Sequence, residues 1–295
     1  MDNLKKLCYS LVLVLVFLLV GCGGDSNAQE STPSGSSPSP SDTSKGSPVS
    51  ISEQVVFDQD GIVVTLTSLE SSAIMGTELK VLIENNTDSA ITVTSRDESI
   101  NGVMVNTMFS VKVEPGKKAN DSMSFFSSSL KSASITTIKD IEFKLHIYDP
   151  DTWDTIADSE TLTITTSADA GFKQGYNDAG NTIYEEGGIK VVLQELVAGS
   201  GSLGPEISVY VENFSDADIR VQLRKTSVNG FMIEPYFTCE VISGKRAFDS
   251  IEFFKSDLDD SKITSIEELE FSLYIREADS WDTIAETDMI IVTFD

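Results

Sequence analysis

Two clusters of carboxylates are the side chains whose types and spacing in this chain could do chemistry. Each cluster places three acidic residues within six positions and contains one of the two tryptophans. The clusters are Asp149, Asp151 and Asp154, and Glu277, Asp279 and Asp282. Ca²⁺ prefers carboxylate and carbonyl oxygens, so both clusters are candidate metal sites. The spacing is not that of an EF-hand loop and aspartate favours hairpin turns, so a capped turn is the alternative.

His146 is the one histidine of the chain, so a Ser-His-Asp or Cys-His mechanism would depend on it. It falls on the polar face of an alternating segment, which predicts a ring in solvent. The sequence contains no phosphate-binding glycine loop and no zinc-ligand spacing. We therefore predict a protein that is not an enzyme, with no catalytic residue and no cofactor other than the Ca²⁺ considered above.

The N-terminus carries the signals of an exported and anchored protein. Lys5 and Lys6 precede an apolar run, Leu11–Val20, which is too short to span a bilayer. The sequence Leu19-Val20-Gly21-Cys22 resembles the lipobox of bacterial lipoproteins. The resemblance implies that residues 1–21 are a signal peptide and that Cys22 carries acyl chains such as palmitate. Two or three chains hold a protein stably on the extracytoplasmic face of the cell membrane. A plain secretory signal with an incidental cysteine is the alternative.

Residues 22–50 are rich in Ser, Pro and Gly and show no apolar periodicity, so we predict a disordered tether of about 30 Å. The formal net charge is −26, and the signal peptide accounts for +1 of it, which leaves −27 from Cys22 onward. Nucleic acid and anionic membrane surfaces both require clustered Lys and Arg. Neither is therefore predicted as a direct partner, and the lipid on Cys22 is the expected link to the membrane.

One cysteine, Cys239, remains after the signal peptide and the lipid acceptor are set aside, so no disulfide between domain cysteines can form within the chain. Cys239 alternates with Phe237 and Val241, as Val111 does in an equivalent segment. This pattern predicts a small buried hydrophobe rather than a reactive thiol.

The elements that would position these side chains occur twice. Residues 79–166 align with residues 207–294 at an offset of 128 without a gap, and the two tryptophans superpose. This duplication predicts two domains, at 51–167 and 182–295, joined by a flexible or lightly docked linker at 168–181. We expect the indoles of Trp153 and Trp281 to pack over the end of each domain rather than to bind a ligand.

Short alternating segments with turns about every ten residues predict seven or eight strands in each copy. Asn101-Gly102 and Asn229-Gly230 are hairpin signals at equivalent positions, and 127–131 and 255–260 could each form one helical turn. The fold class predicted is all-β: two tandem antiparallel sandwiches of immunoglobulin-like size, with a barrel as the alternative.

The order of these motifs also resembles a known group of domains. A Glu-Asn turn, the Asn-Gly hairpin, a Gly-Lys turn, an acidic-Ser strand and a Trp-Asp-Thr-Ile ending follow one another in both copies. The order is similar to that of immunoglobulin-like (telokin-like) domains of unknown function in lipoproteins of Gram-positive bacteria. The resemblance implies a β-sandwich at the cell envelope and transfers no catalytic residues.

Basic residues also recur, at Arg96 with Arg224 and at Lys117-Lys118 with Lys245-Arg246. We expect them to pair with local carboxylates, for example Asp121 and Asp249, and an anion-binding patch is the alternative. Taken together, the sequence predicts a lipid-anchored envelope protein that binds a protein or glycan partner without catalysis. A structural protein stiffened by Ca²⁺ at the acidic turns is the second prediction.

Overall fold

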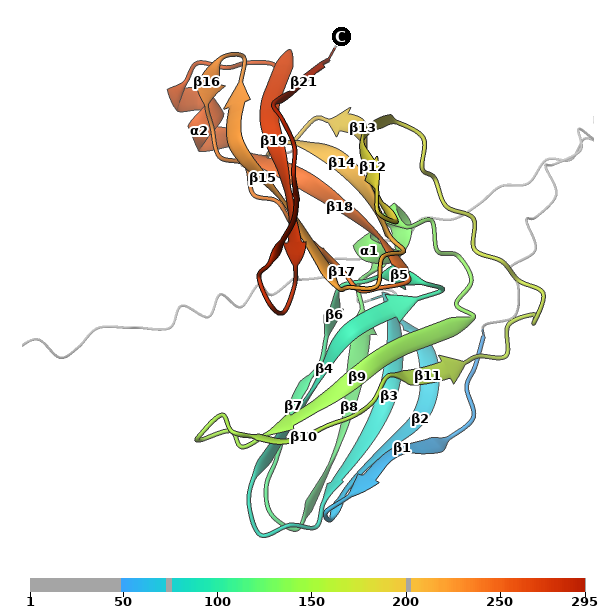
Figure 1. The fold of residues 1–295 in the computed structure, drawn as a ribbon. Helices are drawn as coiled ribbons and strands as arrows, with labels where there is room; N and C mark the ends of the chain where they lie inside the picture. Colours follow the sequence, from blue (N-terminus) through green and yellow to red (C-terminus); the bar gives the residue numbers. More distant parts are fainter. Residues whose placement is uncertain (1–48, 73–75, 200–202, 295) are drawn as a thin grey trace, which may run out of the picture. The chain divides into compact units, whose positions relative to one another are not determined.

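The computed structural model describes residues 49–72, 76–199 and 203–294, and these residues form an all-β protein with two short helices (Figure 1). The predicted signal peptide, the lipid acceptor Cys22 and residues 22–48 of the predicted tether lie outside the described residues. In the part of the chain that is described, no helix is long and apolar enough to cross a membrane.

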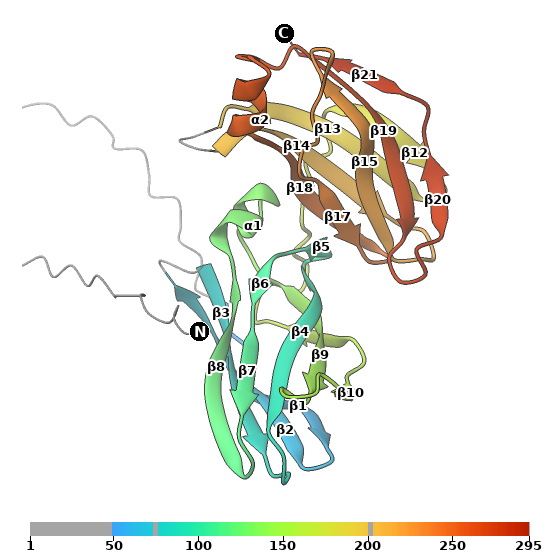
Figure 2. The ribbon, with the colours of Figure 1, turned by 90° about the vertical axis from the view of Figure 1, so that its left-hand side faces the viewer.

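The first repeat contains a five-stranded antiparallel sheet and a second ladder built around two long strands. The five-stranded sheet has the order β1 (Gln54–Gln59), β2 (Ile62–Ser72), β3 (Gly76–Asn85), β8 (Lys117–Phe125) and β6 (Thr107–Met108). The second ladder pairs β4 (Ile91–Ile100) with β9 (Asp140–Tyr148), and adds β5 (Val103–Met104), β7 (Ser110–Val113), β10 (Thr155–Asp158) and β11 (Leu162–Thr165). Helix α1 (Ser127–Ser132) follows β8 (Figure 2).

The second repeat has two corresponding ladders, the first with four strands in place of five. One is β12 (Asn181–Glu186), β13 (Ile189–Val197), β14 (Leu203–Asn213) and β18 (Lys245–Phe254), followed by α2 (Lys255–Asp260). The other has β16 (Phe231–Met232), β15 (Ile219–Val228), β19 (Glu268–Glu277) and β20 (Thr283–Glu286), with β17 (Thr238–Val241) on β15 and β21 (Ile290–Thr293) on β19. A single parallel bridge between Val103 and Arg246 makes β5 and β18 neighbours in one ten-stranded sheet.

Alternation of apolar and polar residues builds a separate hydrophobic core in each repeat. In β9, Phe143 is fully buried, and its equivalent Phe271 in β19 is also fully buried. Each core collects residues from both ladders of its own repeat, so the ladders face each other across it. The all-β prediction is therefore confirmed, and both predicted helical turns are present as α1 and α2.

A buried asparagine fixes the same turn in both repeats. Asn85 is fully buried, and its Nδ2 donates to the carbonyl oxygens of Ser89 at 2.8 Å and Val113 at 3.0 Å. Asn213 is also fully buried and repeats the arrangement with two carbonyl oxygens, each at 2.8 Å. In both cases the side-chain Oδ1 accepts a backbone N–H two residues later. The sequence marked this segment as a turn but did not show that it closes the core.

The predicted Asn-Gly hairpins are confirmed. Asn101 and Gly102 have φ of 53° and 80°, and Asn229 and Gly230 have φ of 50° and 81°. Positive φ at both central residues is what a two-residue turn needs to follow the twist of its strands. The segment 168–181 contacts the first repeat, where the Tyr176 hydroxyl donates to the Asn101 carbonyl oxygen at 2.9 Å.

Candidate functional site

Two exposed indoles occupy equivalent places in the two repeats. Trp153 is 73% exposed and Trp281 is 64% exposed. Each lies in the hairpin that connects two neighbouring strands, β9 to β10 in the first repeat and β19 to β20 in the second. The prediction that these rings pack over the end of each domain is wrong, because one face of each indole rests on a single side chain and most of the ring remains in water.

Local hydrogen bonds shape the first hairpin. The backbone N–H groups of Asp151 and Thr152 donate to Asp149 Oδ1 at 2.8 and 3.1 Å, and the N–H of Trp153 donates to the Asp149 carbonyl oxygen at 2.8 Å. These backbone donors, with that of Asp151 first, lower the pKa of the Asp149 carboxyl group. The Asp149 carboxylate therefore accepts hydrogen bonds from backbone groups of its own turn, as expected for a capped turn.

The second hairpin uses different side chains for the same closure. The N–H of Glu277 donates to the Asp282 carbonyl oxygen at 2.9 Å, and the Ser280 hydroxyl donates to Glu277 Oε2 at 2.6 Å. Among the described residues, no group of three or more His, Cys, Asp or Glu side chains is arranged to hold a metal ion. The Ca²⁺ sites remain a prediction from the sequence.

Aromatic rings support the first indole. Trp153 stacks on Tyr148 with ring centroids 5.3 Å apart and planes 12° apart, and Tyr148 stacks on His146 at 5.4 Å. His146 is 8% exposed, and its Nδ1 lies 2.6 Å from Asp158 Oδ1. The prediction that this histidine faces solvent is wrong, because Tyr148 stacks against the ring and β10 brings Asp158 to its edge.

Arginine takes the place of Tyr148 in the second repeat. The guanidinium group of Arg276 lies 3.6 Å from the centroid of Trp281, and that of Arg220 lies 5.6 Å from the same ring. Arg224 lies 3.2 Å from the centroid of Tyr274, which is the equivalent of His146. Sequence reasoning did not select Arg220, Arg276 or Tyr148, although the offset of 128 aligns Arg276 with Tyr148.

Four of the six recurrent basic residues form ion pairs within the described residues, but with other carboxylates than expected. Lys118 pairs with Glu84 at 2.8 Å, and Arg246 pairs with Glu212 at 2.9 Å. Lys245 pairs with a glutamate of the first repeat at 2.6 Å. The predicted partners Asp121 and Asp249 are therefore wrong.

Cys239 is 2% exposed, in contact with the core of the second repeat. Burial raises the pKa of its thiol well above the ordinary value. A buried neutral thiol packs as a small hydrophobe. The prediction for this residue is confirmed.

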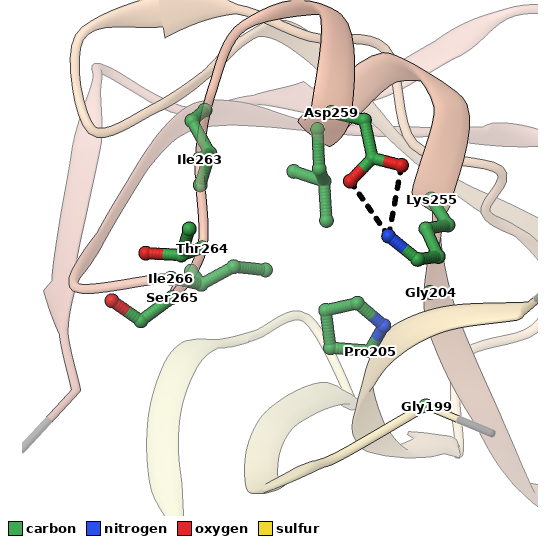
Figure 3. Close-up of a pocket in the computed structure, with 10 residues that line it drawn as sticks. Gly199, Gly204, Pro205, Lys255, Asp259, Ile263, Thr264, Ser265 and Ile266 are labelled. Carbon is green, nitrogen blue, oxygen red and sulfur yellow. Dashed lines mark hydrogen bonds and ion pairs between the residues drawn. The ribbon is translucent and has the colours of Figure 1, made fainter. Parts of the chain in front are cut away.

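A cavity of about 330 Å³ lies beside α2 in the second repeat (Figure 3). Leu258, Ile263 and Ile266 contribute its apolar lining, and Lys255 and Asp259 contribute its charges. The Lys255 Nζ donates to both carboxylate oxygens of Asp259, at 2.7 and 2.8 Å. The two charged groups of the described lining therefore pair with each other.

No family model matches the chain, and no curated protein sequence matches it. Among solved structures, the exo-chitosanase CsxA of Amycolatopsis orientalis aligns at 14% identity with a TM-score of 0.24, over 78% of this chain and 26% of that chain. This chain thus spans about a quarter of the length of the chitosanase. A structure of the SafA pilin of Salmonella enterica with its SafB chaperone aligns at 11% identity with a TM-score of 0.20, over 77% of this chain and 95% of that chain. Similarity at this level carries no argument about function.

Proposed function

We propose that this chain is a lipid-anchored protein on the extracytoplasmic face of the cell membrane that binds a protein or glycan partner without catalysis. It consists of two tandem immunoglobulin-like β-sandwiches, joined to acyl chains on Cys22 by the tether at 22–50. The pair of exposed indoles at equivalent hairpins is the observation that carries the binding role. Tryptophan is enriched among the residues that dominate binding energy, and two copies allow two-point attachment.

The anchor is tested by membrane fractionation of the full-length protein and its Cys22→Ser variant. We expect the wild type in the membrane fraction and the variant in the soluble fraction, because the acyl chains supply the attachment. Retention of the variant on the membrane to the same extent as the wild type would contradict the anchor.

The binding role is tested with the soluble Cys22→Ser chain added to isolated cell envelopes. We expect saturable binding that falls at least tenfold when Trp153→Ala and Trp281→Ala are combined, because both indoles contact the partner. Phe214→Ala is the matched control, since Phe214 is an aromatic residue outside the hairpins that is 48% exposed. Equal binding by the double variant and the control would contradict the proposal that the two hairpins form the binding surface.

A further inference from the structure

One hairpin of the first repeat contacts the second repeat at the start of β18. The Gly102 carbonyl oxygen accepts the backbone N–H of Arg246 at 3.0 Å, beside the parallel bridge between Val103 and Arg246. Glu142 lies next to the base of this hairpin on β9 and pairs with Lys245 at 2.6 Å. A backbone hydrogen bond and an ion pair therefore join the two repeats.

Both sides of this contact have equivalents elsewhere in the chain. The hairpin side recurs in the second repeat, and the basic side recurs in the first. At the offset of 128, the equivalents are Gly230 for Gly102, Glu270 for Glu142, Lys117 for Lys245 and Lys118 for Arg246. Each charged residue keeps its sign, so these two surfaces are complementary in the same way as the two that meet within the chain.

The hairpin of the second repeat leaves its apolar side chains exposed. Phe231 is 52% exposed and Met232 is 72% exposed. At the equivalent positions of the first repeat, Val103 is fully buried and Met104 packs against the core of the second repeat. Exposed apolar side chains at a hairpin whose equivalent is already in contact indicate an interaction surface.

The Glu270 carboxylate beside this hairpin is weakly bonded. It accepts the Ser227 hydroxyl at 3.3 Å, which is longer than an ordinary O–H···O hydrogen bond. In the described part of the chain no ion pair includes Glu270, and none includes Lys117. Both members of the second pair are thus without a counter-charge, whereas their equivalents Glu142 and Lys245 have each other.

The start of β8 presents the matching basic surface, because Lys117 and Lys118 are both exposed. Lys118 lies opposite Glu84 on β3, in the same register as Arg246 opposite Glu212 on β14. Its backbone N–H therefore points away from β3, as the Arg246 N–H points away from β14 toward the first repeat. Strand β6 flanks β8 on that side but pairs with the opposite end of β8.

We propose that the hairpin of the second repeat binds the start of β8 in a second copy of this chain, so that copies join head to tail. The Gly230 carbonyl oxygen accepts the Lys118 N–H of the next copy, and Glu270 pairs with Lys117 of that copy. Because the two joined surfaces differ, each added copy leaves one of each kind free, and the assembly is an open chain rather than a closed dimer.

The contact between copies is expected to be weaker than the contact within the chain. Phe248, which packs against the first core, has Asn120 as its equivalent, and Phe214, which lies against the guanidinium group of Arg246, has Asn86. The formal net charge of −26 also opposes the approach of two copies. Association should therefore depend on concentration.

Sedimentation of the purified full chain carrying Cys22→Ser tests the proposal at about 0.15 M salt, where distant charges are screened. Over concentrations from about 10 µM to about 1 mM, we expect the weight-average mass to rise past that of a dimer, because an open chain continues to grow. The proposal goes beyond the proposed binding function, and this measurement involves neither the lipid anchor nor a cell envelope.

Exchange of charge tests the ion pair. Lys117→Glu and Glu270→Lys should each weaken association by about fivefold or more, because like charges then meet at every junction. The two changes combined in one chain should restore association, since each junction regains an opposite pair and the net charge returns to that of the wild type. Lys173→Glu, at an exposed lysine of the segment 168–181, is the control and should leave association unchanged.

Cross-linking tests the hairpin contact separately. Phe231→Cys and Lys118→Cys are placed in separate chains that carry Cys22→Ser and Cys239→Val, so each chain has one accessible thiol. A short bismaleimide should join the two variants when they are mixed and should not join copies of either variant alone.

Three results would overturn the proposal. The first is a single mass of one copy at every concentration. The second is growth that stops at a dimer, which would indicate a closed contact. The third is a folded double charge variant that associates no better than the single variants, together with no cross-link specific to the mixture. Thermal unfolding of each variant shows that it is folded.

Discussion

The two tryptophan hairpins have one backbone and two kinds of support. Trp153 and Trp281 have φ of 67° and 68°, and they lie in the turns that follow β9 and β19. Trp153 rests on the neutral ring of Tyr148, whereas Trp281 rests on the guanidinium group of Arg276. The comparison teaches that the turn fixes where the ring lies, while the strand residue beneath it decides the charge of the surface.

The largest expected effect comes from the buried asparagines that both repeats share. Asn85→Ala and Asn213→Ala should each reduce the free energy of unfolding by about 2–4 kcal/mol, because one buried and one partly buried carbonyl oxygen lose their donor. Urea denaturation monitored by circular dichroism measures the change. Asn86→Ala, at an exposed neighbour, is the control and should change it by less than about 0.5 kcal/mol. A loss in one repeat alone would show that the two turns are not equivalent.

Exchanging the residues beneath the two indoles, Tyr148 and Arg276, is expected to change the stability by an intermediate amount. The sign of the change should differ between the two repeats. Tyr148→Arg should destabilise the protein by about 1–3 kcal/mol, because it places an unpaired charge beneath Trp153. Arg276→Tyr should change stability by about 0–2 kcal/mol in the favourable direction, since it removes an unpaired buried charge. Thermal unfolding of both variants in parallel gives the comparison, and a destabilised Arg276→Tyr variant would mean that the arginine already has its counter-charge.

The first acidic turn should contribute a pH-dependent part of the stability through Asp149. The pKa of Asp149 is lowered in the folded protein, so its contribution to stability is present above the unfolded pKa of about 3.9 and is lost as the pH falls through the folded pKa. The difference in stability between the wild type and Asp149→Asn should therefore shrink as the pH is lowered from neutrality through this range. Denaturation at a series of pH values measures it, and a difference that stays constant would show that the charge of Asp149 is not held by the turn.

Calcium can be examined on the same turns. Calorimetry of the wild type and of the Asp154→Asn, Asp282→Asn double variant compares the heat of Ca²⁺ addition. Saturable heat that the variant loses would establish the predicted metal site, and absence of heat in the wild type would remove it.

The smallest effect is expected at the core position that differs between the repeats. Cys239→Val introduces the residue that stands at the equivalent Val111 and should change stability by less than about 1 kcal/mol, because shape and burial are kept. The native thiol should also resist alkylation until the protein is unfolded, since burial holds its pKa high. Rapid alkylation of the native protein would show that the second core opens more readily than its packing indicates.

The fold was largely predictable because its signals are local. Alternation over 141–147 and 269–275 marks the core strands, and Asn-Gly pairs mark the hairpins. The burial of His146 was not predictable, because alternation assigns a side chain to a face of the sheet and does not show what covers that face. Tyr148 and Asp158 cover it only after β10 folds back along β9.

The candidate site was less predictable for a related reason. Arg276 stands on the polar face of an alternating strand, where a charged residue is ordinary. Its position beneath Trp281 depends on a positive φ at the tryptophan, and its position opposite Arg220 depends on strand register. The alignment of the two copies contained one signal that could have been used: Arg276 stands where the first copy has Tyr148, next to a hairpin with an equivalent tryptophan.

The left-handed backbone at the two tryptophans lowers the stability of both turns, while it places the two indole rings on the surface. A bulky residue in that conformation costs about 1–2 kcal/mol relative to glycine, which adopts it freely. Glycine at positions 153 and 281 would thus remove this backbone cost from both turns. The protein would then lack the two projecting indole rings. Tryptophan stands at both positions despite this cost, so the stability of the turns alone does not explain either residue.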